Sequence, residues 1–320
     1  IGKIEQRDWE EMKTAMRDTN YWLLVPVALA LLLSHYSRAV RWKILMEPMG
    51  YKPGKLNTYF AVLIGYLANL AVPRLGEVLK CTILARYEKV PADKLIGTIV
   101  AERAFDMICL VIVFAITILS QIDVIGQFAG NMINQLLTGG SGQVNYTRLL
   151  LVLAILLVIG TGSWFALKRF AHLDFIRKLK KVAQGIWEGI ISVRYLKKKG
   201  WFFFHTALIW FLYLASIRIG FYAMDPTSQY GWLPAFSVLS LGSVGMIVTQ
   251  GGIGAYPILV QETMGLYGLG INIGKAFGWI LWLAQFVLVL IAGGAALILL
   301  PVINRNNRPV PAAPSTQVPQ

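Results

Sequence analysis

Charged side chains are scarce in this chain of 320 residues: Asp, Glu, Lys and Arg make up 14% of it, and 56% of its residues are apolar. Soluble globular domains carry about 25% charged residues, so the composition excludes an ordinary soluble protein. The two cysteines, Cys81 and Cys109, form no CxxC pair, which excludes a disulfide-rich scaffold. HExxH, DxD and Walker sequences are also absent. We therefore expect no set of catalytic residues, no metal site and no cofactor.

Long apolar blocks recur along the chain instead. A transmembrane helix needs about 20 mainly apolar residues, so these blocks predict an all-α, polytopic membrane helical bundle over residues 21–301. The formal net charge of +14 is typical of cytoplasmic loops that face anionic lipid, and we expect no binding to nucleic acid. The blocks are Tyr21–Leu33, Tyr59–Val72, Met107–Leu119, Leu149–Ile159, Trp201–Leu214, Trp232–Val248 and Ala276–Leu300.

Basic residues indicate which side of the membrane each loop faces. Arg38, Arg41 and Lys43 follow the first block, so that end is cytoplasmic by the positive-inside rule. Residues 1–20 then face outward as a short surface helix, which requires an earlier span. The loop 120–146 contains no Lys or Arg and is expected to lie outside.

The second half of the chain is expected to end in the cytoplasm. Segment 168–199 carries ten Lys or Arg residues interleaved with apolar ones, which is typical of an amphipathic helix on the inner membrane surface. Residues 302–320 are rich in proline and polar side chains and are predicted to form a disordered cytoplasmic tail. The sequence thus predicts a multi-pass protein of the cell (inner) membrane.

The segment Thr58–Ala85 is interrupted at Pro73-Arg74-Leu75-Gly76-Glu77. Its arms of about 15 and 11 residues are roughly 22 and 17 Å long as helices, too short for a hydrocarbon core of about 30 Å. Basic residues flank both ends. We therefore predict a re-entrant hairpin that enters from the cytoplasm.

The segment Trp232–Leu266 is interrupted at Gln250–Gly254, and both of its flanks are expected outside. Two hairpins that enter from opposite faces form an inverted repeat, and interrupted segments of this kind indicate a transport site. Two kinked full-length spans would give the same topology. Close helix packing is another role for the residues at the breaks, which are Pro73, Gly76, Gly251, Gly252 and Gly254.

Glu102, Arg103 and Asp106 lie within the apolar segment Leu95–Leu119 and share one helix face. Ionisable groups at such depth are costly and usually face the bundle interior. We predict a polar cavity in which arginines bind a phosphate, because the guanidinium fork matches its oxygens. The candidate arginines are Arg74, Arg103, Arg38, Arg41 and Arg218, and the candidate cavity acids are Glu77, Glu102, Asp106 and Glu262.

Purely structural roles are the alternative for these charges. Arg103 with Asp106, or Arg74 with Glu102, would form ion pairs that fix helix positions. Arg38 and Arg41 would extend to the inner headgroups of the membrane.

In these residues the chain resembles the flippase-like transmembrane domain of lysylphosphatidylglycerol synthases and its stand-alone relatives. The resemblance covers roughly 21–301, and it implies movement of a phospholipid or lipid-linked anion between leaflets. It does not imply lysyl transfer, which belongs to a separate soluble domain. At the second break, Gln250 and Tyr256-Pro257 replace the proline and acid usual in the family. The matching motifs are Arg41-Trp42, Asn69, Pro73-Arg74-Leu75-Gly76-Glu77, Glu102-Arg103, Asp106 and Gly251-Gly252-Ile253-Gly254.

The sequence therefore favours a transporter, not an enzyme, with membrane lipids as partners. A membrane-embedded transferase is one alternative, with Glu77, Glu102 or Asp106 as base or metal ligand. A non-catalytic scaffold that recruits proteins through 168–199 is another, and formation of a homo-oligomer is compatible with either.

Overall fold

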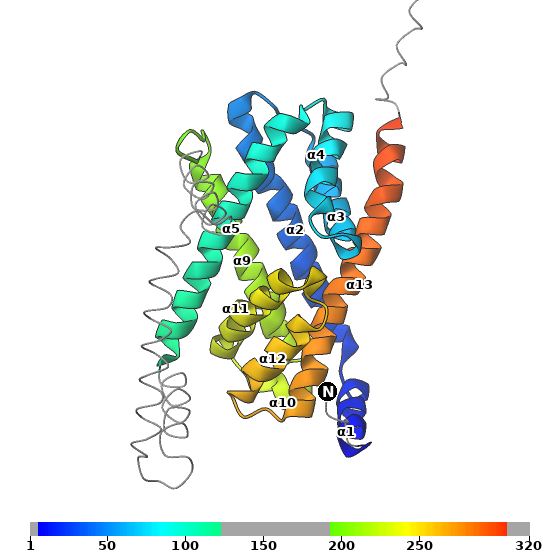
Figure 1. Ribbon diagram of the computed structural model, residues 1–320, viewed down its shortest axis with the longest axis vertical. Helices are drawn as coiled ribbons and strands as arrows, with labels where there is room; N and C mark the ends of the chain where they lie inside the picture. The colour runs from blue at the N-terminus through cyan, green and yellow to red at the C-terminus, as the bar shows by residue number, and fades with distance from the viewer. Residues whose placement is uncertain (1–5, 123–192, 306–320) are drawn as a thin grey trace, which may run out of the picture.

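The computed structural model describes residues 6–122 and 193–305, and every regular element in these ranges is a helix (Figure 1). This confirms the predicted all-α membrane bundle. The helices are α1 (Gln6–Arg17), α2 (Leu24–Met46), α3 (Lys55–Ala71), α4 (Leu75–Glu88), α5 (Ala92–Ser120), α9 (Lys199–Phe221), α10 (Asp225–Ser228), α11 (Trp232–Val248), α12 (Ala255–Gly265) and α13 (Ile271–Ile303).

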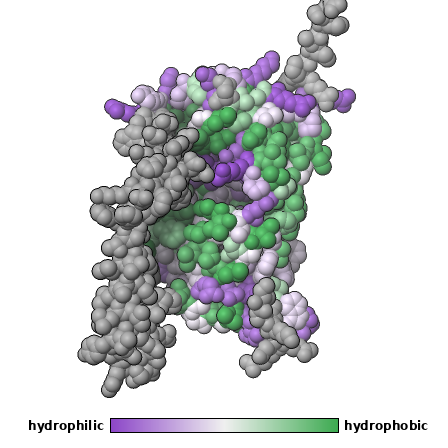
Figure 2. Space-filling model, in the orientation of Figure 1, coloured by the Kyte–Doolittle hydropathy of each residue, from purple (hydrophilic) through white to green (hydrophobic). Residues whose placement is uncertain are grey.

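Within residues 6–122 and 193–305, three stretches are long and apolar enough to cross a membrane: Tyr21–Met49, which contains α2, Lys199–Phe221 and Ile271–Ile303. Helix α5 has 29 residues, which is roughly 43 Å of helix. It is therefore long enough to span as well, although it carries charges in its interior. Large apolar side chains cover much of the outer surface (Figure 2), as expected where lipid replaces water.

The first broken segment folds back on itself, because α3 and α4 form an antiparallel hairpin. At its open end, Asn57 Nδ2 donates to Glu88 Oε1 at 2.6 Å. Near its tip, a Cβ on Gly76 would overlap the carbonyl of Gly65 on the facing helix. Asn69 Oδ1 accepts from the backbone N–H of Gly76 at 2.8 Å, which satisfies one of the free donors at the start of α4. The prediction of a hairpin is confirmed.

The second broken segment forms another antiparallel hairpin, from α11 and α12. Gly245 lies against the backbone of Tyr256 near the tip. Gly251, Gly252 and Gly254 all have positive φ, from 61° to 75°, a conformation that residues with a Cβ rarely adopt. These glycines are therefore required by the turn itself.

The two hairpins point in opposite directions and meet at their tips. In Figure 1, α3 and α4 descend from one end of the molecule, and α11 and α12 rise from the other. Gln250 Nε2 donates to the Leu70 carbonyl at 2.9 Å, which joins the two tips. Trp282 of α13 donates from Nε1 to the Gly251 carbonyl at 2.8 Å. The inverted arrangement of the two hairpins is confirmed.

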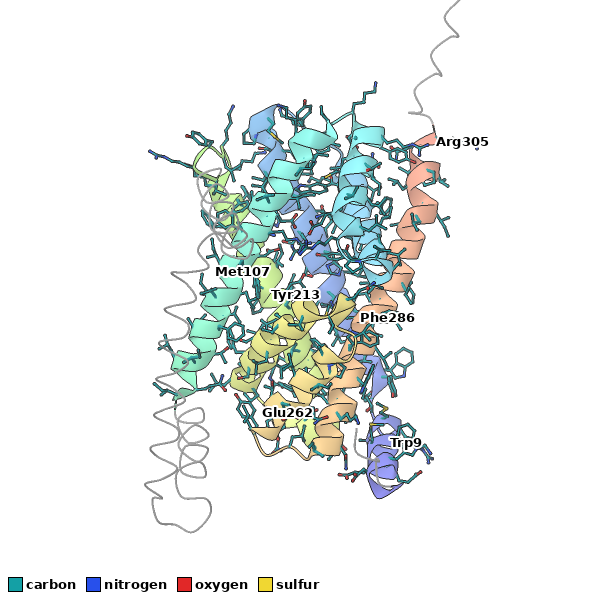
Figure 3. All side chains as sticks on the ribbon, viewed as in Figure 1. Trp9, Met107, Tyr213, Glu262, Phe286 and Arg305 are labelled. Atoms are coloured by element: carbon teal, nitrogen blue, oxygen red, sulfur yellow. The ribbon has the colours of Figure 1, made fainter. Side chains whose placement is uncertain are left out.

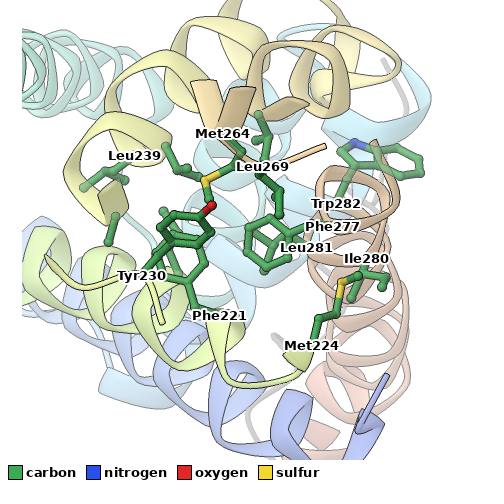
Figure 4. Close-up of a cluster of buried hydrophobic side chains, with 14 of the residues drawn as sticks. Phe221, Met224, Tyr230, Leu239, Met264, Leu269, Phe277, Ile280, Leu281 and Trp282 are labelled. Atoms are coloured by element: carbon green, nitrogen blue, oxygen red, sulfur yellow. The ribbon is translucent and has the colours of Figure 1, made fainter. Parts of the chain in front are cut away.

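A large apolar cluster fixes the second hairpin against α9 and α13 (Figure 4). Phe221 of α9 stacks on Phe277 of α13 with ring centroids 5.2 Å apart, and Met264 of α12 is fully buried beside them. This packing holds α11 and α12 in place although neither is long enough to span a membrane.

The ends of the chain agree in part with the predicted segments. Helix α1 packs beside α13, where Asn272 donates to Asp8 and Glu11; its outward orientation stays a prediction. Helix α13 continues to Ile303, so the first two residues of the predicted 302–320 tail are helical. Most of segment 168–199 and residues 306–320 lie outside the described residues.

Candidate functional site

Two arginines of α2 are buried against two acids of α5. Arg38 Nη1 lies 2.9 Å from Glu102 Oε1 and 2.5 Å from Asp106 Oδ2. Arg41 Nη2 lies 2.7 Å from Asp106 Oδ1 and 3.6 Å from Glu102 Oε1. The side chains of Arg41 and Glu102 are 0% and 1% exposed. The alternative in which both arginines extend to the headgroups is therefore wrong.

A third cation, Lys80 of α4, completes this buried cluster. Its Nζ lies 3.2 Å from Glu102 Oε2 and 4.8 Å from the centre of the Trp42 ring. Trp42 is held in turn by its Nε1 donating to Thr98 Oγ1 at 2.8 Å. We call these five charged residues the charge cluster: Arg38, Arg41, Lys80, Glu102 and Asp106.

The charge cluster contains more positive than negative charge. Three cations less two carboxylates leave a net charge of +1 among the described residues. Arg38 Nε and Arg41 Nε are buried and have no hydrogen-bond partner in this part of the chain. Buried polar groups are almost always paired, so unused donors beside a positive excess suit a negatively charged ligand.

A cavity of about 370 Å³ opens beside the charge cluster. Its polar lining consists of Arg38, Arg103, Asp106, Tyr66 and Tyr213, together with Ser216, Ser243 and Gln285. The remaining wall is mainly apolar and includes residues of the second hairpin: Val238, Leu239, Met246, Ile247 and Tyr256. Figure 2 shows hydrophilic side chains near mid-height of a face that is otherwise mainly hydrophobic.

Arg103 and Glu77 form a separate, more exposed pair between α5 and α4. Arg103 Nε lies 3.0 Å from Glu77 Oε1, with side chains 46% and 34% exposed. Arg103 also lines the cavity. The alternative pairing of Arg103 with Asp106 is wrong. Arg103 binds Glu77, and Asp106 binds the two arginines of α2.

A family assignment agrees with this architecture. The sequence profile of the family described as "Lysylphosphatidylglycerol synthase TM region" matches residues 3–293. The chain belongs to this family. A UPF0104 membrane protein from Methanocaldococcus jannaschii is 30% identical over 71 residues, which is 21% of each chain. That match spans about a fifth of the relative's length, and no solved structure matches the chain.

Four predicted site residues of this family member come together in the charge cluster. Arg103 lines the cavity beside it and binds Glu77, and the remaining charged candidates lie elsewhere. Arg74 is exposed at the tip of the first hairpin in a left-handed conformation, with φ of 65°, so the alternative pair of Arg74 with Glu102 does not form. Arg218 donates to Tyr222 of its own helix. Glu262 is exposed on α12, and Figure 3 shows it near the end of the molecule, away from Met107 and Tyr213 beside the cavity.

The glycines and Pro73 shape the backbone of the breaks. Pro73 is exposed in the turn between α3 and α4. Gly76, Gly251, Gly252 and Gly254 permit close approach or positive φ. None of these five residues lines the cavity.

Sequence reasoning missed Lys80, although a lysine three residues after Glu77 within an apolar half-helix was a usable signal. It also missed Tyr66 and Tyr213. Tyr213 accepts a hydrogen bond from Arg38 Nη2 at 3.4 Å. Half-buried tyrosines in apolar segments carry no pattern that separates them from core residues, so only the packing of α3 and α9 identifies these two.

Proposed function

We propose that this member of the lysylphosphatidylglycerol synthase transmembrane family is a transporter that moves a lipid with an anionic headgroup between leaflets. The single observation that carries the proposal is the net charge of +1 in the buried charge cluster. An uncompensated charge away from water is costly, and a bound phosphate would bring the local charge to zero. Family membership supports a lipid-related function in a membrane.

The position of the cavity suits a headgroup. It lies close to the meeting point of the two hairpin tips, since both Tyr66 of α3 and Met246 of α11 line it. Arg38 presents a guanidinium on the polar wall, and a guanidinium binds phosphate oxygens through parallel hydrogen bonds. The apolar wall formed by α11 tolerates the first part of an acyl chain, while the rest of the chain stays in lipid.

The same contacts disfavour the transferase alternative. A catalytic base or metal ligand needs an available carboxylate, whereas Glu102 and Asp106 are both held by cations of the charge cluster. Glu77 is held by Arg103. We therefore favour transport without chemical change of the lipid, in the cell (inner) membrane with a cytoplasmic C-terminus. The scaffold alternative depends on segment 168–199, and most of this segment lies outside the described residues.

Translocation in liposomes tests this function. Purified protein is reconstituted in phosphatidylcholine vesicles that contain a trace of fluorescent phosphatidylglycerol, and dithionite reports the fraction in the outer leaflet. We expect the wild type to move the probe and Lys80→Met to lose most of this activity, because the variant reduces the cluster to zero net charge. The double variant Lys80→Met with Glu102→Gln restores the charge of +1 and is expected to recover activity.

Glu262→Gln is the matched control, because it removes an exposed acid far from the charge cluster. It should translocate as the wild type does. Equal activity of Lys80→Met and the wild type, with both proteins folded, would refute the role of the positive excess. Chemical conversion of the probe would favour a transferase.

A further inference from the structure

His35 of α2 is a buried titratable residue beside the cavity that the proposed function does not yet use. It is 2% exposed. Neither Nδ1 nor Nε2 has a hydrogen-bond partner among the described residues. Its spacing of four residues from Leu31 and three from Arg38 places all three on one helix face. His35 itself is not a lining residue, but Leu31, Arg38 and Tyr66 all line the cavity. Because the Tyr66 ring packs on the imidazole, His35 lies behind this wall.

The described surroundings of His35 provide no hydrogen-bonded acid for its ring. Arg38 lies one turn further along the same helix, and Tyr66 of α3 packs on the imidazole with ring centroids 4.6 Å apart. The carboxylates of α5, Glu102 and Asp106, are bound by Arg38 itself, and Tyr213 of α9 also binds Arg38. No described acid contacts the ring directly. A protonated imidazole would add a second uncompensated charge to a cluster that already carries +1.

An anion in the cavity would lower the cost of a positive charge on His35. A monoanionic phosphate at Arg38 brings the local charge from +1 to zero, and protonation of His35 then returns it only to +1. The two events therefore favour each other, since each lowers the cost of the other. The unpaired ring nitrogens provide the place where the proton binds.

We propose that His35 carries a proton with each anionic headgroup, so that transport is anion–proton symport; this inference rests on the proposed function. An N–H bond forms at the free ring nitrogen as the phosphate enters, with the proton supplied by water on the same side. That bond breaks when the phosphate leaves on the other side, and the proton returns to water. One negative lipid and one proton together move no net charge.

Electroneutral movement gives a test that separates this inference from the function itself. Liposomes containing wild-type protein and fluorescent phosphatidylglycerol receive a potential of about 100 mV through potassium and valinomycin. Such a potential changes the equilibrium distribution of a single charge about fifty-fold. With the wild type, we expect the distribution of the probe between leaflets to be independent of the potential and to change with a pH gradient. Entrapped pyranine reports proton entry.

His35→Gln keeps a polar side chain of similar size, but its carboxamide group does not take up a proton. We expect it to translocate the probe without a pyranine signal, and its lipid distribution to follow the potential. His205→Gln is the matched control, because His205 Nδ1 is hydrogen-bonded to Ser37 Oγ at 2.8 Å, whereas both ring nitrogens of His35 lack a partner among the described residues; it should behave as the wild type.

The outcomes are distinct. A wild type that translocates but follows the potential, or a His35→Gln variant that still moves protons, would overturn the symport while leaving the function standing. A wild type that moves no lipid would overturn both proposals. If folded His35→Gln moves no lipid, the response of the wild type to the potential decides. A wild type whose lipid distribution ignores the potential then supports obligatory symport, and one whose distribution follows the potential overturns it.

Discussion

Removing Glu102 should destabilise the protein far more than removing Glu77, although both acids bind cations between α4 and α5. Glu102 is 1% exposed and contacts Arg38 and Lys80, so Glu102→Gln leaves three buried cations with one carboxylate. Removing one partner of a buried ion pair costs about 3–5 kcal/mol. The pair of Glu77 and Arg103 is 34% and 46% exposed, and exposed pairs contribute about 0.2–1 kcal/mol.

A second substitution should restore much of the stability that Glu102→Gln loses. Lys80→Met in the Glu102→Gln background removes the uncompensated cation, and replacing a whole buried pair is often neutral. We therefore expect the double variant to recover at least about 2 kcal/mol relative to Glu102→Gln alone, which is a positive coupling energy in the double-mutant cycle.

The assay is unfolding in detergent micelles, followed by the reaction of Cys81 with a thiol-reactive dye. Cys81 lies on α4 beside Lys80 and is 4% exposed, so it reacts only when this region opens. A Glu102→Gln variant no less stable than Glu77→Gln would refute the reasoning. A double variant that loses the sum of both single effects would also refute it.

Two further predictions concern the hairpins. Gly76→Ala should lower the free energy of unfolding by about 1–3 kcal/mol or more, because its Cβ would overlap the backbone of α3; Gly97→Ala, which meets open space, should be neutral or slightly stabilising in the same unfolding assay. In a cysteine-free background, Leu70→Cys with Gln250→Cys should be joined by a short bis-maleimide, because the two tips are hydrogen-bonded. Leu70→Cys with Glu262→Cys should not be joined, and the opposite pattern on a denaturing gel would contradict the meeting of the tips.

The overall architecture was predictable because hydrophobic length and charge placement act over short stretches of sequence. Arms too short to span, with both flanks expected on the same side of the membrane, predicted both hairpins, and the structure confirms that both segments fold back on themselves. Glu102 and Asp106 were found for the same reason, since an acid inside an apolar segment requires a buried partner.

The partners of those acids were not predictable, because they depend on how four helices pack. Arg38 and Arg41 lie near the end of the first apolar block, where an arginine that reaches the headgroups gives the same sequence pattern. Only the packing of α2 against α5 and α9 shows that they turn inward. Arg74 was misleading for the opposite reason: it lies beside the break in sequence, but the turn carries it to the exposed tip.

Binding of lipids to the purified protein tests most directly whether the buried positive excess selects an anion. Native mass spectrometry would compare phosphatidylglycerol and phosphatidylcholine, which differ in headgroup charge, on the wild type, Lys80→Met and the Lys80→Met, Glu102→Gln double variant. We predict that the wild type and the double variant retain phosphatidylglycerol preferentially, and that Lys80→Met loses this preference. Equal retention of both lipids by the wild type, or an unchanged preference in Lys80→Met, would contradict an anion site at the charge cluster.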